Sequence, residues 1–149
     1  ASKYYDPTSG ITYASITHAN GVTYRIALPP NSVDSDAILQ MVSPNDVAWC
    51  GLAWGGHMTQ NPLSVSWSTG QGTSANTTHW QVTARCQGCT RWSSADGDTN
   101  LDSQPEALFA YACSSVAPDV RTSNTSAFNI HEQYGTWTHD LIIAKNESY

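Results

Sequence analysis

The most distinctive chemical motif in the sequence is Cys86-Gln-Gly-Cys89. Cysteines at this spacing form a redox-active dithiol, half of a zinc site or a local structural disulfide. A redox dithiol belongs at the start of a helix in a βαβ unit, and a zinc site needs a second such pair or paired histidines. Neither accompanies this motif, and a c-type haem would need histidine where Thr90 stands. We predict a Cys86–Cys89 disulfide, which leaves Cys50 and Cys113 either to pair with each other or to remain unpaired.

Methionine and histidine offer a second kind of chemistry. The chain has two methionines; Met41 lies in an apolar run, whereas Met58 follows two glycines at the end of an expected strand. Of the five histidines, His131 is flanked by aromatic and aliphatic residues in the segment 128–134. A thioether and a neutral imidazole form an axial pair of electron-transfer haems. A haem held by Met58 and His131 is therefore one hypothesis, and ordinary packing of both side chains is the other.

Other sites of chemistry are weakly indicated. The sequence contains no HExxH, GxSxG, P-loop or dinucleotide-binding motif. Asp96, Asp98 and Asp102 fall in an expected loop that lacks the ligand pattern of an EF-hand. We interpret these carboxylates as solvated turn residues.

The elements that must position these residues are short strands. Period-two alternation recurs along the chain and helical periodicity is almost absent. Gly, Pro, Asn and Asp fill the connections, a pattern typical of an antiparallel β-sandwich, immunoglobulin-like in outline, formed by residues 1–149 as one domain. The expected strands are 22–28, 37–42, 48–54, 63–67, 80–84, 107–113 and 140–144.

Composition narrows the class of protein further. Only 12 % of the 149 residues are charged, and the formal net charge of −6 argues against nucleic acid and anionic membranes as partners. No apolar run reaches the length of a membrane span, and no signal peptide is visible, as in a mature chain. Even-numbered cysteines and three glycosylation sequons, at Asn76, Asn124 and Asn146, favour a secreted, extracellular protein.

Several segments, in order along most of the chain, resemble one family. They resemble the cytochrome domain of fungal cellobiose dehydrogenase, and the Arg-Cys-x-x-Cys-x-x-Trp stretch is the most specific of them. The resembling segments are Tyr5-Asp-Pro-Thr-Ser-Gly-Ile-Thr12, Trp49-Cys-Gly-Leu-Ala-Trp-Gly-Gly-His-Met58, Thr78-His-Trp-Gln-Val-Thr-Ala-Arg-Cys-Gln-Gly-Cys-Thr-Arg-Trp92 and Phe128-Asn-Ile-His131.

The resemblance implies a β-sandwich that holds a b-type haem noncovalently. It places the methionine ligand at Met58 and the histidine ligand at His131, with Tyr134 as an aromatic residue packed on the haem. The family's local disulfide corresponds to Cys86 and Cys89, and Cys50 matches a family cysteine whose partner the resemblance does not identify. Adjacent residues of an extended segment project to opposite sides, so His57 and Met58 are not expected to bind one iron together.

Further site residues are proposed on the same basis. Trp54, Trp67 and Ile130 are candidates for the walls around the haem, with core packing as the alternative for the two tryptophans. Arg121 is the candidate partner of the haem propionates. Between Trp67 and Asn76 the family carries a considerably longer stretch, which includes an aromatic residue at the haem. The resemblance thus implies a shortened relative with a more exposed haem, or a sequence that lacks this stretch.

Two functions follow as hypotheses. The first is a monomeric electron-transfer domain that accepts single electrons from a flavin dehydrogenase domain and passes them to an acceptor such as a copper-dependent polysaccharide monooxygenase. No catalysis is expected from the domain alone. The second is a haem-free carbohydrate-binding β-sandwich in which Trp80 and Trp92 stack on sugar rings.

Overall fold

The computed structural model describes residues 1–30, 36–68, 73–123, 125–147 and 149. Strands dominate, with one short 3₁₀ turn, η1, at Leu101–Ser103. No helix in these ranges is long and apolar enough to cross a membrane. The strands are β1 (Ser2–Asp6), β2 (Ile11–Thr17), β3 (Thr23–Ala27), β4 (Asp36–Pro44), β5 (Trp49–Ala53), β6 (Leu63–Trp67), β7 (Thr73–Ala75), β8 (His79–Gln87), β9 (Arg91–Ser94), β10 (Gly97–Asn100), β11 (Glu106–Ser114) and β12 (Gln133–Asp140).

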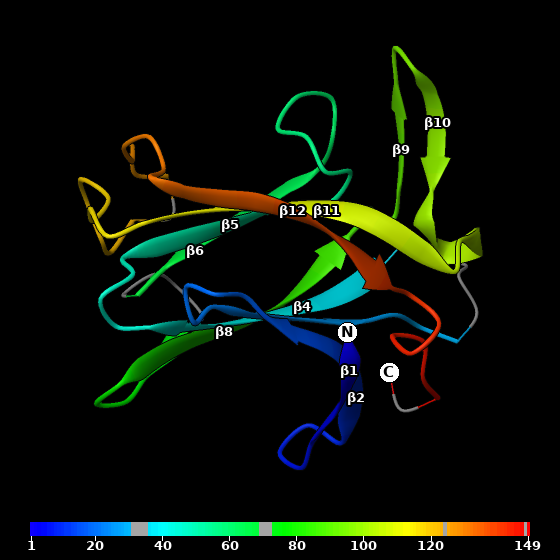
Figure 1. The fold of residues 1–149 in the computed structure, drawn as a ribbon, viewed down its shortest axis with the longest axis horizontal. Helices are drawn as coiled ribbons and strands as arrows, with labels where there is room; N and C mark the ends of the chain where they lie inside the picture. Colours follow the sequence, from blue (N-terminus) through cyan, green and yellow to red (C-terminus); the bar gives the residue numbers. More distant parts are fainter. Residues whose placement is uncertain (31–35, 69–72, 124, 148) are drawn as a thin grey trace.

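Two antiparallel sheets pack as a β-sandwich, which confirms the predicted fold class. One sheet has the order β1-β2-β3-β4-β8-β7 and the other the order β12-β11-β5-β6, while β9 and β10 form a separate hairpin. Figure 1 shows the four-stranded sheet lying over the larger one, with the β9–β10 hairpin rising beside the loop between β5 and β6. The hairpin and this loop therefore lie together at one end of the sandwich.

The core fills the space between the two sheets. Alternate residues of β3 point into it, and Tyr24 and Ile26 are fully buried, as the period-two pattern of this stretch predicts. From the other sheet, Trp54 and Phe109 meet edge to face with ring centroids 5.7 Å apart. Met41 is 2 % exposed, so its expected packing role is confirmed.

The first six expected strands correspond to β3, β4, β5, β6, β8 and β11, but the seventh is wrong. Residues 141–144 form a turn, because the side chain of Asp140 accepts hydrogen bonds from the backbone N–H groups of Ile142 and Ile143. Leu141 and Ala144 are buried within this turn, which explains the apolar pattern. The last strand is β12, whose inward residues Trp137 and His139 alternate with threonines.

Buried His139 makes stability depend on pH. It is fully buried, and its Nδ1 accepts a hydrogen bond from Trp137 Nε1 at 2.9 Å. Burial lowers its pKa from 6.5 to about 4, so the unfolded chain binds more protons than the folded chain between these values. The free energy of unfolding is therefore expected to fall by roughly 2–3 kcal/mol as the pH drops from about 7 to about 4.5.

Urea unfolding across this pH range measures the effect. His139→Gln is expected to flatten the acid limb, whereas His79→Gln, at an exposed position, is expected to keep it. An acid limb that stays equally steep in His139→Gln would show that another group causes the pH dependence.

Candidate functional site

The outer face of the four-stranded sheet carries unusually small side chains. Cys50, Leu52, Phe109 and Cys113 point into the core, so the residues next to each of them on the strands point outward. On that outer face Ala53 lies opposite Leu63 and Ala110, and Gly51 lies opposite Val65 and Ala112. On the neighbouring strand β12, Thr136 lies opposite Ala110 and Tyr134 lies opposite Ala112. The middle of this face is therefore a floor of glycine and alanine, defined by Gly51, Ala53, Ala110 and Ala112.

A cavity of about 910 Å³ lies over this floor. Its size is within the roughly 300–1,000 Å³ of ligand and cofactor sites. None of the side chains described around it belongs to Asp, Glu, Lys or Arg, and most are apolar. Apolar side chains remain exposed at this cavity; they are Met58, Leu63, Val65, Phe128, Ile130 and Tyr134. Such a gathering of exposed apolar surface marks a binding site for an apolar ligand or partner.

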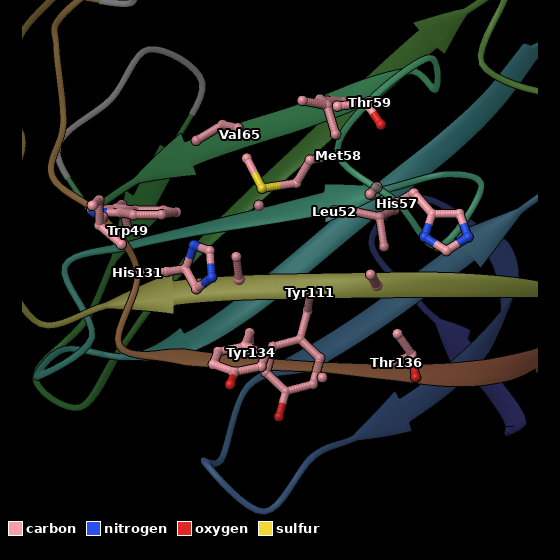
Figure 2. A pocket seen from close by; sticks show the side chains of 18 of the residues that line it. Trp49, Leu52, His57, Met58, Thr59, Val65, Tyr111, His131, Tyr134 and Thr136 are labelled. Carbon is pink, nitrogen blue, oxygen red and sulfur yellow. The ribbon is translucent and has the colours of Figure 1, made fainter. Parts of the chain in front are cut away.

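Met58 enters the cavity from the loop between β5 and β6 (residues 54–62). Its side chain is 63 % exposed, which is unusual for methionine, whereas Met41 is buried in the core. Figure 2 shows the Met58 thioether extending over the floor, while the His57 ring points elsewhere along the cavity. The segment is bent rather than extended, so the geometry behind the expected projection to opposite sides is absent, and both side chains line the same cavity.

His131 enters the same cavity from the segment that leads into β12. Its ring lies 5.3 Å from the Tyr134 ring, edge to face. In the part of the chain that the structure describes, no side chain or backbone group forms a hydrogen bond with either ring nitrogen of His131. Figure 2 shows this ring and the Met58 thioether reaching over the floor from different sides. The structure thus brings together in one cavity the two residues that the sequence singles out.

Glu132 fixes the segment that carries His131. Its carboxylate accepts hydrogen bonds from Ser114 Oγ, Ser115 N and Ser115 Oγ, each at 2.6 Å. These bonds lower the pKa of Glu132 to about 2, and they tie the start of β12 to the end of β11. Because the carboxylate stays ionised far into the acid range, this attachment is expected to persist at mildly acidic pH.

The predicted wall residues divide between the cavity and the core. Ile130 is 87 % exposed at the cavity rim, and Tyr134 lines the cavity wall. Trp54 is fully buried, and its Nε1 donates to Ser64 Oγ at 3.0 Å, so it does not line the cavity. Trp67 is also buried, and its Nε1 donates to the carbonyl oxygen of Arg121 at 2.7 Å. Trp54 therefore packs in the core, as the alternative interpretation holds. Trp67 instead lies on the outer face of β6 with Leu63 and Val65, and its ring packs on Phe128 at the edge of the cavity. Neither Trp67 nor Arg121 is among the residues described around the cavity.

The four cysteines form two disulfides. Cys50 pairs with Cys113 directly across β5 and β11, which confirms the first of the two alternatives for these cysteines. Cys86 pairs with Cys89, as predicted, where β8 turns into β9. The first bond crosslinks the strands whose outer faces form the floor of the cavity, and the second lies at the base of the β9–β10 hairpin.

The sequons differ in exposure. Asn76 is exposed, and its Oδ1 accepts hydrogen bonds from the backbone of Thr78 and His79. Asn146 is half-buried, and its Nδ2, the atom that would carry a glycan, donates to the carbonyl oxygens of Thr12 and Ala144. Asn124 lies outside the described residues. Asn76 is thus the described sequon that presents its side chain to solvent.

The glycine and alanine floor of the cavity is not predicted from the sequence. Small residues alternate at 51 and 53 and again at 110 and 112, which is a visible signal within two expected strands. The pattern does not show that β5 and β11 are neighbours in the sheet. The two strands are far apart in the sequence, and their paired cysteines are separated by 63 residues. Only this pairing converts two short alternations into one surface.

The exposed tryptophans expected of a carbohydrate-binding module are not found as predicted. Trp80 is fully buried, and its Nε1 donates to the carbonyl oxygen of Val47 at 2.7 Å, so the prediction of a sugar-stacking Trp80 is wrong. Trp92 is half-buried beside Gly55, at a small cavity of about 210 Å³.

Comparison with known proteins gives a consistent result. The sequence matches the family described as the cytochrome domain of cellobiose dehydrogenase over residues 4–73 and 69–149, two parts that meet in the connection after β6. The fold is similar to that of the cytochrome b domain of pyranose dehydrogenase from Coprinopsis cinerea, with a TM-score of 0.80 and 21 % identity over 99 % of this chain and 91 % of that one. It is also similar to the cytochrome domain of Myriococcum thermophilum cellobiose dehydrogenase, with a TM-score of 0.76 and 22 % identity over 99 % and 92 % of the two chains.

Membership of this family implies a haem-bearing, electron-transferring role, and the family match covers nearly the whole sequence. The chain is a cytochrome domain of the cellobiose dehydrogenase type.

Proposed function

We propose that the cavity on the outer face of the four-stranded sheet binds a b-type haem noncovalently, with Met58 and His131 as the axial ligands. The observation that carries the proposal is that both side chains line one apolar cavity of about 910 Å³. They come from the loop after β5 and from the start of β12, at opposite ends of the floor and of the sheet.

The residues around the cavity suit such a group. The glycine and alanine floor leaves depth where larger side chains would fill the space, and the walls exclude water from an apolar macrocycle. The thioether of Met58 and the imidazole of His131 are the donor types of six-coordinate electron-transfer haems. Tyr134 and Ile130 are proposed to pack on the bound group, since both lie exposed at the cavity.

A haem bound in this way supplies a centre that takes up and releases one electron. If Met58 and His131 both bind the iron, such a haem would transfer electrons rather than activate oxygen or a substrate. The soft sulfur of Met58 favours the ferrous state and raises the reduction potential. The role proposed for this chain's own residues is to present the two side chains to the bound group in a fixed arrangement.

The proposal extends to the setting of the protein. We propose a secreted, monomeric domain that receives electrons from a flavin dehydrogenase domain and delivers them to an external acceptor, such as a copper-dependent polysaccharide monooxygenase. The two disulfides and the exposed sequon at Asn76 support an oxidising, extracellular environment. For such brief encounters we expect a docking surface of mixed polar character with some charge complementarity to the partner.

The absorbance spectrum of the protein mixed with ferric haem and then reduced tests this function. We expect sharp Soret and α bands of a low-spin haem, loss of the haem on acid–acetone extraction, and no dehydrogenase activity from the chain alone. A protein that stays colourless after haem addition would contradict the proposal. In that case, retention of the protein on immobilised polysaccharide would support the carbohydrate-binding alternative.

A further inference from the structure

The loop that carries Met58 has no regular secondary structure of its own. Residues 54–62 form turns and bends between β5 and β6. The exposed side chain of Met58 cannot fix the loop by packing. The position of the Met58 backbone must therefore be set by contacts of the neighbouring residues.

The first half of the loop is pressed against the sandwich. Gly56 has a φ of +81°, and a Cβ at this position would lie 2.8 Å from Cγ and Cδ2 of Leu108. A Cβ on Gly55 would lie 2.9 Å from Cζ2 of Trp92 and closer still to the Asn61 amide. Glycine at both positions therefore lets the backbone approach β11 and the β9–β10 hairpin closely.

The second half of the loop is held by a side chain that brackets Met58. Asn61 Nδ2 donates to the carbonyl oxygen of His57 at 3.0 Å and to that of Thr59 at 3.2 Å. These are the residues immediately before and after Met58. One amide group thus fixes the backbone on both sides of the proposed ligand.

Gln60 connects this bracket to the hairpin. Its φ of 63° is the only positive value at a non-glycine residue in the described part of the chain. A left-handed conformation at such a residue costs about 1 kcal/mol and persists where surrounding contacts impose it. Here the Oε1 of Gln60 accepts a hydrogen bond from the backbone N–H of Ala95 at 3.0 Å, in the turn between β9 and β10.

The hairpin is itself anchored. Trp92 packs against the core, and the Cys86–Cys89 disulfide closes the turn that precedes β9. At the base, Thr90 Oγ1 and Arg91 Nε both donate to the carboxylate of Asp102, at 3.1 and 3.0 Å. Asp102 is buried, so its interpretation as a solvated turn residue is wrong. The hairpin therefore provides a fixed support beside the loop (Figure 1).

We propose that Asn61 is a positioning residue for the Met58 ligand and that Gln60 ties its loop to the β9–β10 hairpin. The inference rests on the proposed function, because it concerns the ligand that Met58 supplies there. The bracket holds the backbone at Met58 beside the cavity before any ligand binds, so less backbone freedom is lost when the sulfur is engaged.

Two measurements test the proposal. In the haem-free protein, Asn61→Ala and Gln60→Gly are expected to speed amide hydrogen exchange in residues 56–60; glycine keeps the positive φ of Gln60 but removes its hydrogen bond. In the haem-loaded ferric protein, added imidazole competes with Met58 for the iron. Asn61→Ala is expected to tighten imidazole binding about tenfold, since two hydrogen bonds of about 1 kcal/mol each hold the loop.

The control is Asn45→Ala. Asn45 Nδ2 also donates to a backbone carbonyl oxygen, that of Asn76 at 3.0 Å, but in the turn between β4 and β5. It is expected to leave loop exchange and imidazole affinity unchanged. Unchanged exchange or unchanged imidazole affinity in Asn61→Ala would overturn the positioning role. If Met58→Leu also left imidazole affinity at the wild-type value, the proposed ligand itself would be wrong, which is a distinguishable result.

Discussion

Replacing His131 with alanine is expected to lower haem affinity by more than about 100-fold, beyond the 10- to 100-fold cost of losing an outer-shell partner. The imidazole is the stronger of the two proposed axial donors, and the cavity has no covalent link to retain the haem. Met58→Leu, in contrast, conserves side-chain volume and removes only the sulfur donor. It is expected to keep the haem but to shift it to a high-spin form with a lower reduction potential.

Haem titrations followed by absorbance measure both effects. His57 lines the same cavity and carries an alternative donor, so the Met58 variant is also made together with His57→Gln. This background ensures that a low-spin spectrum in Met58→Leu cannot come from the neighbouring imidazole. His131→Ala with wild-type haem affinity, or the double variant with a wild-type reduced spectrum, would remove the corresponding residue as a ligand.

Filling the floor of the cavity is the second change with a large expected effect. Ala112 lies in the floor, opposite Gly51 on one side and Tyr134 on the other. Ala112→Leu places an isobutyl group where the haem would lie, and haem affinity is expected to fall by at least about tenfold, or 1.4 kcal/mol. Because this side chain points away from the core, the unfolding temperature of the haem-free protein is expected to change little.

Thr138→Leu provides the matched control. Thr138 lies on the same strand and face as Tyr134 and Thr136, is exposed, and does not line the cavity. It is expected to bind haem as the wild type does. Equal haem affinity in Ala112→Leu and the wild type would place the haem elsewhere on the molecule, whereas equal losses in both leucine variants would point to a general effect of an added apolar side chain.

The sequence predicts the strands of the sandwich better than it predicts the site. Alternation in β3 reports burial directly, because Tyr24 and Ile26 share the face that packs in the core. The segment 140–144 shows the limit of this signal, since buried Leu141 and Ala144 lie in a turn set by the side chain of Asp140. Apolar spacing alone does not distinguish a strand from a turn that packs against the core.

The site divides in the same way. Met58 and His131 stand out because methionine is scarce and because the histidine lies among apolar neighbours. The floor and the bracket around Met58 depend instead on which strands and loops become neighbours, and no local pattern carries that information. Trp54 illustrates the difference: its position in the sequence, close to Met58, suggests a cavity wall, but the strand alternation turns it into the core.

The most direct test of the central claim follows the two methionine methyl groups by NMR. In protein labelled with ¹³C at the methionine methyls, the haem-free chain is expected to give two signals in the ordinary methyl range, from Met41 and Met58. After haem binding and reduction, we predict that one signal moves far upfield, because the ring current of the haem acts on the methyl group of an axial methionine. Met58→Leu should remove that signal and leave Met41 in place. Two unshifted methyl signals in the reduced, haem-loaded protein would contradict the assignment of Met58 as the ligand.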